Sequence, residues 1–258
     1  MSIVKTEKYP LPPKEAGKFI ANQAKHVKIK DEGIERLGDK ILQSFREGKL
    51  SVENFSQSAV HPKASDPKAI DWLFVVDTLN FCFWHNEDEE GWVVDKYTGY
   101  FALCAAINRA IKEGIDITNP SFYSTMTKEQ LQHILRSDTK VEVPLLNERL
   151  ECLHSVGKTL IEKFEGSFKK CVEEADNSAM KLLDIIVDNF QCFQDEAFYI
   201  SMKICIYKRA QILIGDIWAC FQGKGLGKFN DIYKITMFAD YAFHRLYYIL
   251  KCSNTVTN

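Results

Sequence analysis

A 16-residue stretch, AIDWLFVVDTLNFCFW (69–84), is apolar almost throughout and most constrains how this chain can fold. It must be buried, because exposing so much apolar surface to water is unfavourable. A helix needs roughly 18 to 20 apolar residues to cross a bilayer, and no apolar run of that length occurs in the chain. No membrane span is therefore expected. Periodicity does not separate a buried helix from a buried strand here, but the length favours a helix.

Helical signals recur along the rest of the chain. Apolar residues are spaced helically between 34 and 45, and Gly48 can end that helix. Thr127 and Gln130 resemble a capping box at the start of a helix. Further helices are expected to begin near Pro10, Pro12 and Pro13, to span 99–113, 144–164, 178–190 and 204–221, and to follow Ile232. With no repeat and no convincing linker, the pattern predicts a mainly α fold built as a single helical domain.

Composition narrows the class of protein. The 258 residues suffice for one large domain or two small ones. Lys and Arg total 33 against 35 Asp and Glu, a net charge of −2. This balance argues against a protein that binds duplex nucleic acid, which relies on a surplus of basic groups.

The cysteines and the N-terminus point to a reducing, intracellular compartment, most simply the cytoplasm. Eight cysteines are scattered through apolar stretches without a CxxC pair or zinc-ligand spacing. They are expected to be free, mostly buried thiols. The N-terminal segment lacks the apolar core of a secretory signal. The acidic turn HNEDEEGW (85–92) has no recognised ligand spacing, so neither a metal nor another cofactor is expected.

Three polar residues are candidates for chemistry. Asp240 lies in the apolar segment ITMFADYAF, where a carboxylate must be paired, solvated or functional. On the residues alone, a helix N-cap or a partner for Arg209 or Arg245 is the simpler reading. Lys208 is either a surface cation or a phosphate contact. His61, in the loop VHPK, is either solvated or a ligand contact.

Several long segments resemble one family in order along the chain, from about Pro12 to Tyr241. They are DWLFVVDTLNFCFW, GYFALCAAINRAIKEGI, ILRSDT, ERLECLHSVGKTLIEKFEGSF, YKRAQILIGDIWACFQGKG and ITMFADY. Together they are similar to the queuosine salvage proteins, which are queuosine 5′-phosphate N-glycosylase/hydrolases. The resemblance implies a helical fold related to helix–hairpin–helix DNA glycosylases. It also implies hydrolysis of the bond that joins queuine to ribose 5-phosphate, with the released base re-entering tRNA modification.

The resemblance also implies roles for particular residues. The acid of FADY is the family's catalytic carboxylate, which carries over to Asp240. Phe238 then lies against the base, Ala239 contacts it through its backbone, and Tyr241 is a further substrate contact. The family commonly has HxxHPK in the preceding loop, where this chain has SAVHPK. His61 therefore stands at the second histidine and Ser58 at the first, and either position could carry the family's contact.

The pattern departs from the family after Tyr241, where an RxPQ-like segment is usual and this chain reads AFHRLYYILKCSNTVTN. We therefore expect a flexible lead-in at 1–11, the family domain at 12–241 and an atypical tail at 242–258. Part of the pocket is then expected to be missing, and turnover by this chain to be weak or absent. The expected partner is a free nucleotide, rather than a stably bound nucleic acid or a membrane. The oligomeric state is left open.

Two other functions fit the residues. The first is a glycosylase that acts on a base flipped out of DNA or RNA, which would require a basic face near GKGLGKF (223–229). The second is a helical protein that binds queuine or a related nucleotide without turnover.

Overall fold

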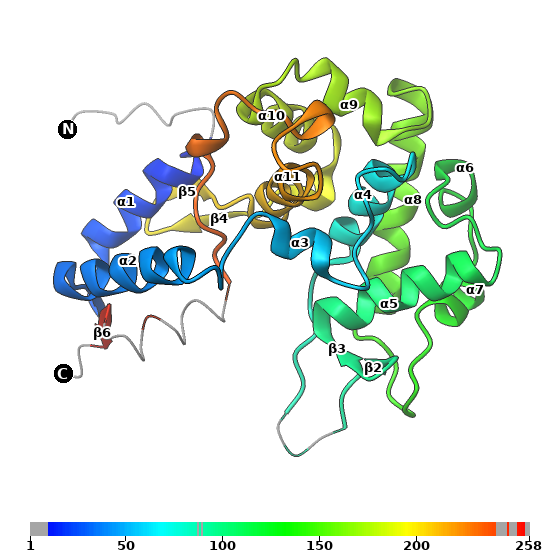
Figure 1. Ribbon diagram of the computed structural model, residues 1–258, viewed down its shortest axis with the longest axis horizontal. Helices are drawn as coiled ribbons and strands as arrows, with labels where there is room; N and C mark the ends of the chain where they lie inside the picture. The colour runs from blue at the N-terminus through cyan, green and yellow to red at the C-terminus, as the bar shows by residue number, and fades with distance from the viewer. Residues whose placement is uncertain (1–9, 87, 89, 241–246, 248–251, 256–258) are drawn as a thin grey trace. The chain divides into compact units, whose positions relative to one another are not determined.

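The computed structural model describes residues 10–86, 88, 90–240, 247 and 252–255 (Figure 1). The chain is grouped into two compact units. Unit 1 consists of three segments, residues 1–52, 194–208 and 236–258, and unit 2 consists of residues 53–193 and 209–235. No helix in the described parts of the chain is long and apolar enough to cross a membrane.

Unit 2 is almost entirely helical, as the sequence predicts. Its α-helices are α3 (Glu53–Gln57), α4 (Ala69–Leu79), α5 (Gly99–Lys112), α6 (Pro120–Tyr123), α7 (Lys128–Ile134), α8 (Leu146–Lys163), α9 (Phe168–Glu174), α10 (Ala179–Asn189) and α11 (Lys208–Cys220), of which Lys208 itself is grouped with unit 1. Short elements complete it: the hairpin of β2 (Val93–Val94) and β3 (Tyr97–Thr98), and the 3-10 turns η1 (Gln191–Phe193), η2 (Gly225–Gly227) and η3 (Ile232–Lys234).

Helix α4 is the centre of unit 2, which explains its composition. It packs against α5, α8 and α9 (Figure 1), and every residue from Trp72 to Leu79 is buried. The Phe74 ring stacks on Phe168 with centroids 4.2 Å apart and meets the edge of Phe190 at 5.0 Å. A helix enclosed on all sides has no polar stripe, so its sequence shows no helical periodicity.

The apolar run of 69–84 ends as a helix at Leu79, five residues before its sequence does. The guanidinium of Arg149, which is fully buried, donates hydrogen bonds to the carbonyls of Leu79, Phe81 and Cys82. Cys82 adopts a left-handed conformation with φ of 53°. Arg149 thus satisfies carbonyls that a continuing helix would have used itself.

Helix ends in unit 2 are fixed by side chains. The Thr127 side chain accepts from the Gln130 N–H while the Gln130 side chain accepts from the Thr127 N–H, so the predicted capping box is confirmed. Asp71 of α4 caps helix α9, because its carboxylate accepts from the N–H of Phe168 at the start of that helix. These contacts satisfy donors that a helix leaves unpaired in its first turn.

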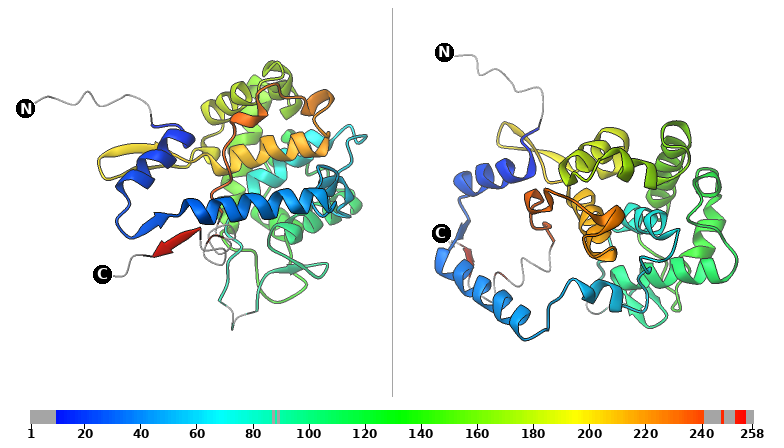
Figure 2. Two further views of the ribbon diagram at one scale, coloured as in Figure 1. Left: turned by 60° about the vertical axis from the view of Figure 1, so that its left-hand side comes forward. Right: turned by 45° about the horizontal axis from the view of Figure 1, so that its top comes forward.

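Unit 1 holds helices α1 (Pro13–Gln23) and α2 (Asp31–Arg46), and strands β1 (Val27–Ile29), β4 (Glu196–Tyr199), β5 (Met202–Cys205) and β6 (Ser253–Thr255). Strand β5 pairs with β4 and contacts α1, which lies beside the yellow hairpin in Figure 2. Strand β1 pairs antiparallel with β6, joining Val27 to Thr255. Cys252 is buried and donates to the Gly33 carbonyl of α2. The described part of the expected tail is therefore paired within unit 1.

One predicted helix needs correction. The helix predicted from 204 begins at Lys208, because residues 202–205 form strand β5. The turn η3 spans Ile232–Lys234 and residues 235–240 are not helical, whereas residue 247 is helical; the rest of the segment in which a helix was expected after Ile232 lies outside the described residues.

Candidate active site

The predicted catalytic acid forms an ion pair in unit 1. The Asp240 carboxylate accepts from the Lys208 ammonium, with Nζ and Oδ2 2.5 Å apart. Both side chains are about 30% exposed, at 30% for Lys208 and 29% for Asp240. The sequence did not predict this pair, and Arg245, one of the partners considered, lies outside the described residues. The contact orients a carboxylate that stays partly exposed.

Local backbone geometry positions Lys208. Strand β5 ends at Cys205, and Tyr207 then adopts a left-handed conformation with φ of 51°, which turns the chain into α11. Asp195, at the base of the same hairpin, accepts from the Lys208 N–H at 2.7 Å and so caps the helix. The lysine therefore occupies a defined position at a helix start rather than in a loop.

The other residues of the predicted segment lie directly before Asp240. Phe238 is partly exposed and Ala239 is exposed. The Asp240 N–H donates to the Phe238 carbonyl at 2.8 Å, forming a tight turn between the two residues. The predicted contact Tyr241 lies outside the described residues.

His61 belongs to unit 2 and sits among aromatic rings. It stacks on Phe55 with centroids 4.0 Å apart and on Phe101 at 5.8 Å, and meets the edge of Tyr100 at 5.6 Å. Its Nδ1 must donate to the Phe55 carbonyl, 2.9 Å away, because a carbonyl only accepts. Burial lowers the pKa of the imidazole, which favours the neutral ring.

The remaining ring nitrogen of His61 is therefore an acceptor, and this Nε2 is buried without a hydrogen-bond partner among the residues that the structure describes. Ser58, at the other loop position of the family motif, is partly exposed and accepts from the His61 N–H through its carbonyl at 3.4 Å. Of the two positions, His61 is the one that offers an unused acceptor.

Two neighbouring acids in unit 2, Asp77 and Asp216, were missed by the sequence reasoning. Asp77 of α4 is fully buried; its Oδ1 accepts from Asn80 at 3.2 Å, but its Oδ2 has no partner in the described part of the chain. Burial and the neighbouring Asp216 of α11 raise the pKa of Asp77 well above its usual range. Burial raises the pKa of Asp216 to about 7, although Tyr100 donates to it at 3.3 Å. An acid within an apolar helix, as in LFVVDTL and ILIGDIW, was the available signal.

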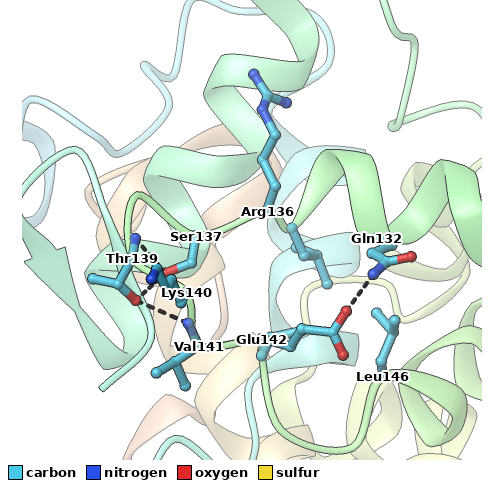
Figure 3. A pocket seen from close by; sticks show the side chains of 10 residues that line it. Gln132, Arg136, Ser137, Thr139, Lys140, Val141, Glu142 and Leu146 are labelled. Carbon is cyan, nitrogen blue, oxygen red and sulfur yellow. Dashed lines mark hydrogen bonds between the residues drawn. The ribbon is translucent and has the colours of Figure 1, made fainter. Parts of the chain in front are cut away.

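Two further features bear on ligand chemistry. Among the described residues, no group of three or more His, Cys, Asp or Glu side chains is placed to hold a metal ion. A hollow of about 170 Å³ lies beside the loop that precedes α8 (Figure 3). Its Arg136 pairs with Glu113, and Gln132 donates to Glu142 across the hollow. None of the predicted site residues lines it.

Comparison with known proteins decides the family. A model of the queuosine salvage protein family matches residues 60–256. This chain belongs to the queuosine salvage family. The match includes His61, Lys208 and the segment from Phe238 to Asp240, and it extends to residue 256, beyond the point at Tyr241 where the family pattern was expected to end.

Proteins from distant organisms are similar to this chain over most of its length. A protein of Bos taurus is 46% identical over 238 residues, covering 90% of this chain and 69% of its own length. One from Nematostella vectensis is 45% identical, covering 89% and 67%, and one from Schizosaccharomyces pombe is 34% identical, covering 91% and 72%. Each is named queuosine 5′-phosphate N-glycosylase/hydrolase. The similarity therefore spans nearly all of this chain and about two thirds or more of these relatives.

Proposed function

We propose that this chain hydrolyses the N-glycosidic bond of queuosine 5′-phosphate and releases queuine, with Asp240 as the catalytic carboxylate. Family membership over residues 60–256 supports the reaction. The observation that carries the choice of residue is the ion pair of Asp240 with Lys208 at 2.5 Å, in a partly exposed position. The fold is proposed to be related to that of helix–hairpin–helix DNA glycosylases.

Asp240 suits the charge that the reaction develops. Breaking the bond between the base and the ribose builds positive charge on C1′ and the ring oxygen, as in glycoside hydrolysis. A carboxylate beside C1′ stabilises this state and can attack C1′ or orient a water molecule. Asp240 must be ionised for any of these roles. The Lys208 ammonium favours the ionised form, because an opposite charge at this distance stabilises a carboxylate.

Lys208 has a second proposed role as the contact for the 5′-phosphate. An ammonium has three donors, and the described contact with Asp240 uses one of them. A phosphate oxygen can therefore bind the same group while the carboxylate stays oriented. This arrangement would couple substrate binding to the position of the catalytic acid.

The base needs contacts of a different kind. Queuine is a 7-deazaguanine and lacks the N7 that purine hydrolases often protonate, so the leaving base is stabilised by other hydrogen bonds. Phe238 and Tyr241 are proposed to contact its flat ring, and Ala239 its edge through the backbone. The unpartnered Nε2 of His61 suits an N–H or O–H group of the substrate, because it accepts without carrying charge.

The test is a product assay with queuosine 5′-phosphate, in which released queuine is separated and identified by mass. Asp240→Asn keeps the size of the side chain but removes its charge, and should lower kcat by about a thousandfold or more. Lys208→Met should lower kcat/KM by about ten- to a hundredfold, with a large part of the loss in KM.

Lys203 of β5 offers a matched control, because it forms a comparable ion pair, 2.6 Å long, with Glu196 of β4. Lys203→Met should change kcat/KM by less than about twofold. Near-normal turnover by Asp240→Asn would overturn the assignment of Asp240. Absence of queuine release by the wild-type chain, with the substrate still bound, would instead support a binding protein without turnover.

A further inference from the structure

Two cysteines far apart in sequence meet in unit 2. Cys152 lies on α8 and Cys192 in the turn η1. The Cys192 thiol is hydrogen-bonded to the Cys152 sulfur. Both side chains are partly exposed, whereas five of the eight cysteines, including Cys104 and Cys171, are buried. The pair therefore combines contact between two thiols with access from solvent.

Two arginines flank the pair. Arg149 lies one helical turn before Cys152 on α8, and its guanidinium sits over the Phe81 ring at 4.4 Å. Arg209 sits over the same ring at 4.9 Å and donates to the Cys192 carbonyl. Both guanidiniums therefore lie close to where a thiolate would form, and each favours the negatively charged sulfur.

We propose that Cys152 and Cys192 form a covalent modification site, at which a hydroperoxide closes the two thiols into an intramolecular disulfide and a small thiol reopens it. This inference does not depend on the proposed glycosidase activity. It rests on the contact between the two sulfurs, on their partial exposure and on the two adjacent guanidiniums.

The chemistry balances in two steps. The Cys152 thiolate attacks the peroxide, breaking the O–O bond, so that Cys152 becomes a sulfenic acid and hydroxide leaves. The Cys192 sulfur then attacks the sulfenic sulfur, forming the S–S bond, and the sulfenic oxygen leaves as water with the Cys192 proton. Two thiols and one hydrogen peroxide give one disulfide and two waters. Two equivalents of a thiol such as glutathione reverse the reaction through a mixed disulfide.

Cys152 is assigned the attacking role because of its surroundings. The hydrogen bond from Cys192, assisted by Arg209 and Arg149, lowers the pKa of Cys152 to about 7 from an ordinary 9.0. At pH 7 its thiolate fraction is then about fiftyfold that of an ordinary cysteine. A less basic thiolate is a weaker nucleophile, so the net advantage in rate is about sixfold. The pKa of Cys192 is raised, chiefly because it donates to Cys152, so Cys192 serves as the resolving thiol.

The decisive experiment uses the full wild-type chain. Fully reduced protein is treated with one equivalent of hydrogen peroxide, the remaining thiols are alkylated, and peptides are mapped without reduction. The expected result is a linked pair of peptides containing Cys152 and Cys192, with an intact mass about two hydrogens lower, restored by glutathione. A disulfide at other positions, or oxidation of Cys82 while this pair stays reduced, would overturn the proposal.

Variants separate the two roles. In Cys192→Ser the disulfide is absent, and a 1,3-dione probe should trap a sulfenic acid on Cys152. In Cys152→Ser both the fast reaction with peroxide and the trapped species should be lost. Cys82→Ser is the control, because Cys82 is the exposed cysteine, and its loss should leave the linked peptides unchanged. Equal rates of peroxide consumption in Cys152→Ser and the wild type would exclude Cys152 as the attacking thiol.

Discussion

Replacement of Arg149 tests the packing of unit 2 most severely. Its guanidinium is fully buried and donates to four carbonyl oxygens, those of Pro144, Leu79, Phe81 and Cys82. Burial lowers the pKa of Arg149 to about 10, so the group stays charged at neutral pH. Arg149→Ala leaves these carbonyls without their donor at the end of the central helix α4.

The loss of unfolding free energy expected for Arg149→Ala follows from the contacts of its guanidinium. Leaving a buried acceptor unsatisfied costs roughly 1 to 3 kcal/mol each, and part of this loss is recovered because the charge no longer has to be desolvated. A net loss of about 4 kcal/mol is expected, a large share of the roughly 5 to 15 kcal/mol by which domains are stable. With a slope of about 2 kcal/mol per molar urea, the unfolding midpoint should fall by about 2 M. Tryptophan fluorescence can follow this transition, since Trp72 and Trp92 are buried in unit 2.

Two further variants make this result interpretable. Arg149→Lys keeps the charge but loses the forked geometry, and should fall between the wild type and Arg149→Ala. Arg136→Met removes a surface ion pair with Glu113, in which both side chains are more than 30% exposed, and should cost less than about 1 kcal/mol. A loss below about 1 kcal/mol in Arg149→Ala, or an equal loss in Arg136→Met, would refute this account of how α4 ends.

Three other predictions concern stability. Burial beside Asp216 raises the pKa of Asp77, so above about pH 4 the folded state binds more protons than the unfolded state. The free energy of unfolding should therefore fall as the pH rises above this value. Asp77→Asn should flatten this dependence, and identical pH profiles in urea titrations would contradict it. Asp231 accepts from the Ala179 N–H at 2.6 Å, so Asp231→Ala should lower the free energy of unfolding by about 1 to 2 kcal/mol; hydrogen exchange should locate the loss in α10. Thr127→Ala removes a capping box and should cost about 1 kcal/mol by the same urea assay, with α7 exchanging faster.

Much of the helical architecture follows from local sequence signals. Helices α2, α5 and α8 each bring apolar residues to one face at a spacing of three and four, and this pattern shows their existence and approximate bounds. The hairpin of β4 and β5 gave no comparable signal. Its segment EAFYISMKIC has no Gly or Asn-Gly turn, and Ile200 takes the left-handed conformation at its tip, with φ of 50°. A β-branched residue is unusual there, so no local signal in the sequence pointed to this turn.

Only part of the candidate site could be predicted from the sequence. The segment from Phe238 to Asp240 could be identified because the family motif is continuous in sequence. The pairing of Asp240 with Lys208 could not, because 32 positions separate them and no periodicity links a strand–helix junction to a distant irregular segment. Asp77 and Asp216 were visible as acids in apolar helices, but their proximity depends on how α4 and α11 pack. Sequence therefore indicated which groups are costly to bury, and the structure showed which groups meet.

The pairing of β1 with β6 has a consequence for biosynthesis. Val27 can pair with Thr255 only after the ribosome has added Thr255, more than two hundred residues later in the chain. Unit 1 therefore cannot complete its pairing during most of translation, whereas the long middle segment of unit 2, residues 53–193, emerges well before the end. Meanwhile the apolar face of α2, including Ile41, Leu42 and Phe45, is exposed on the nascent chain, and these residues stay more than 40% exposed after folding. The N-terminal segment is thus where a chaperone would be expected to bind first.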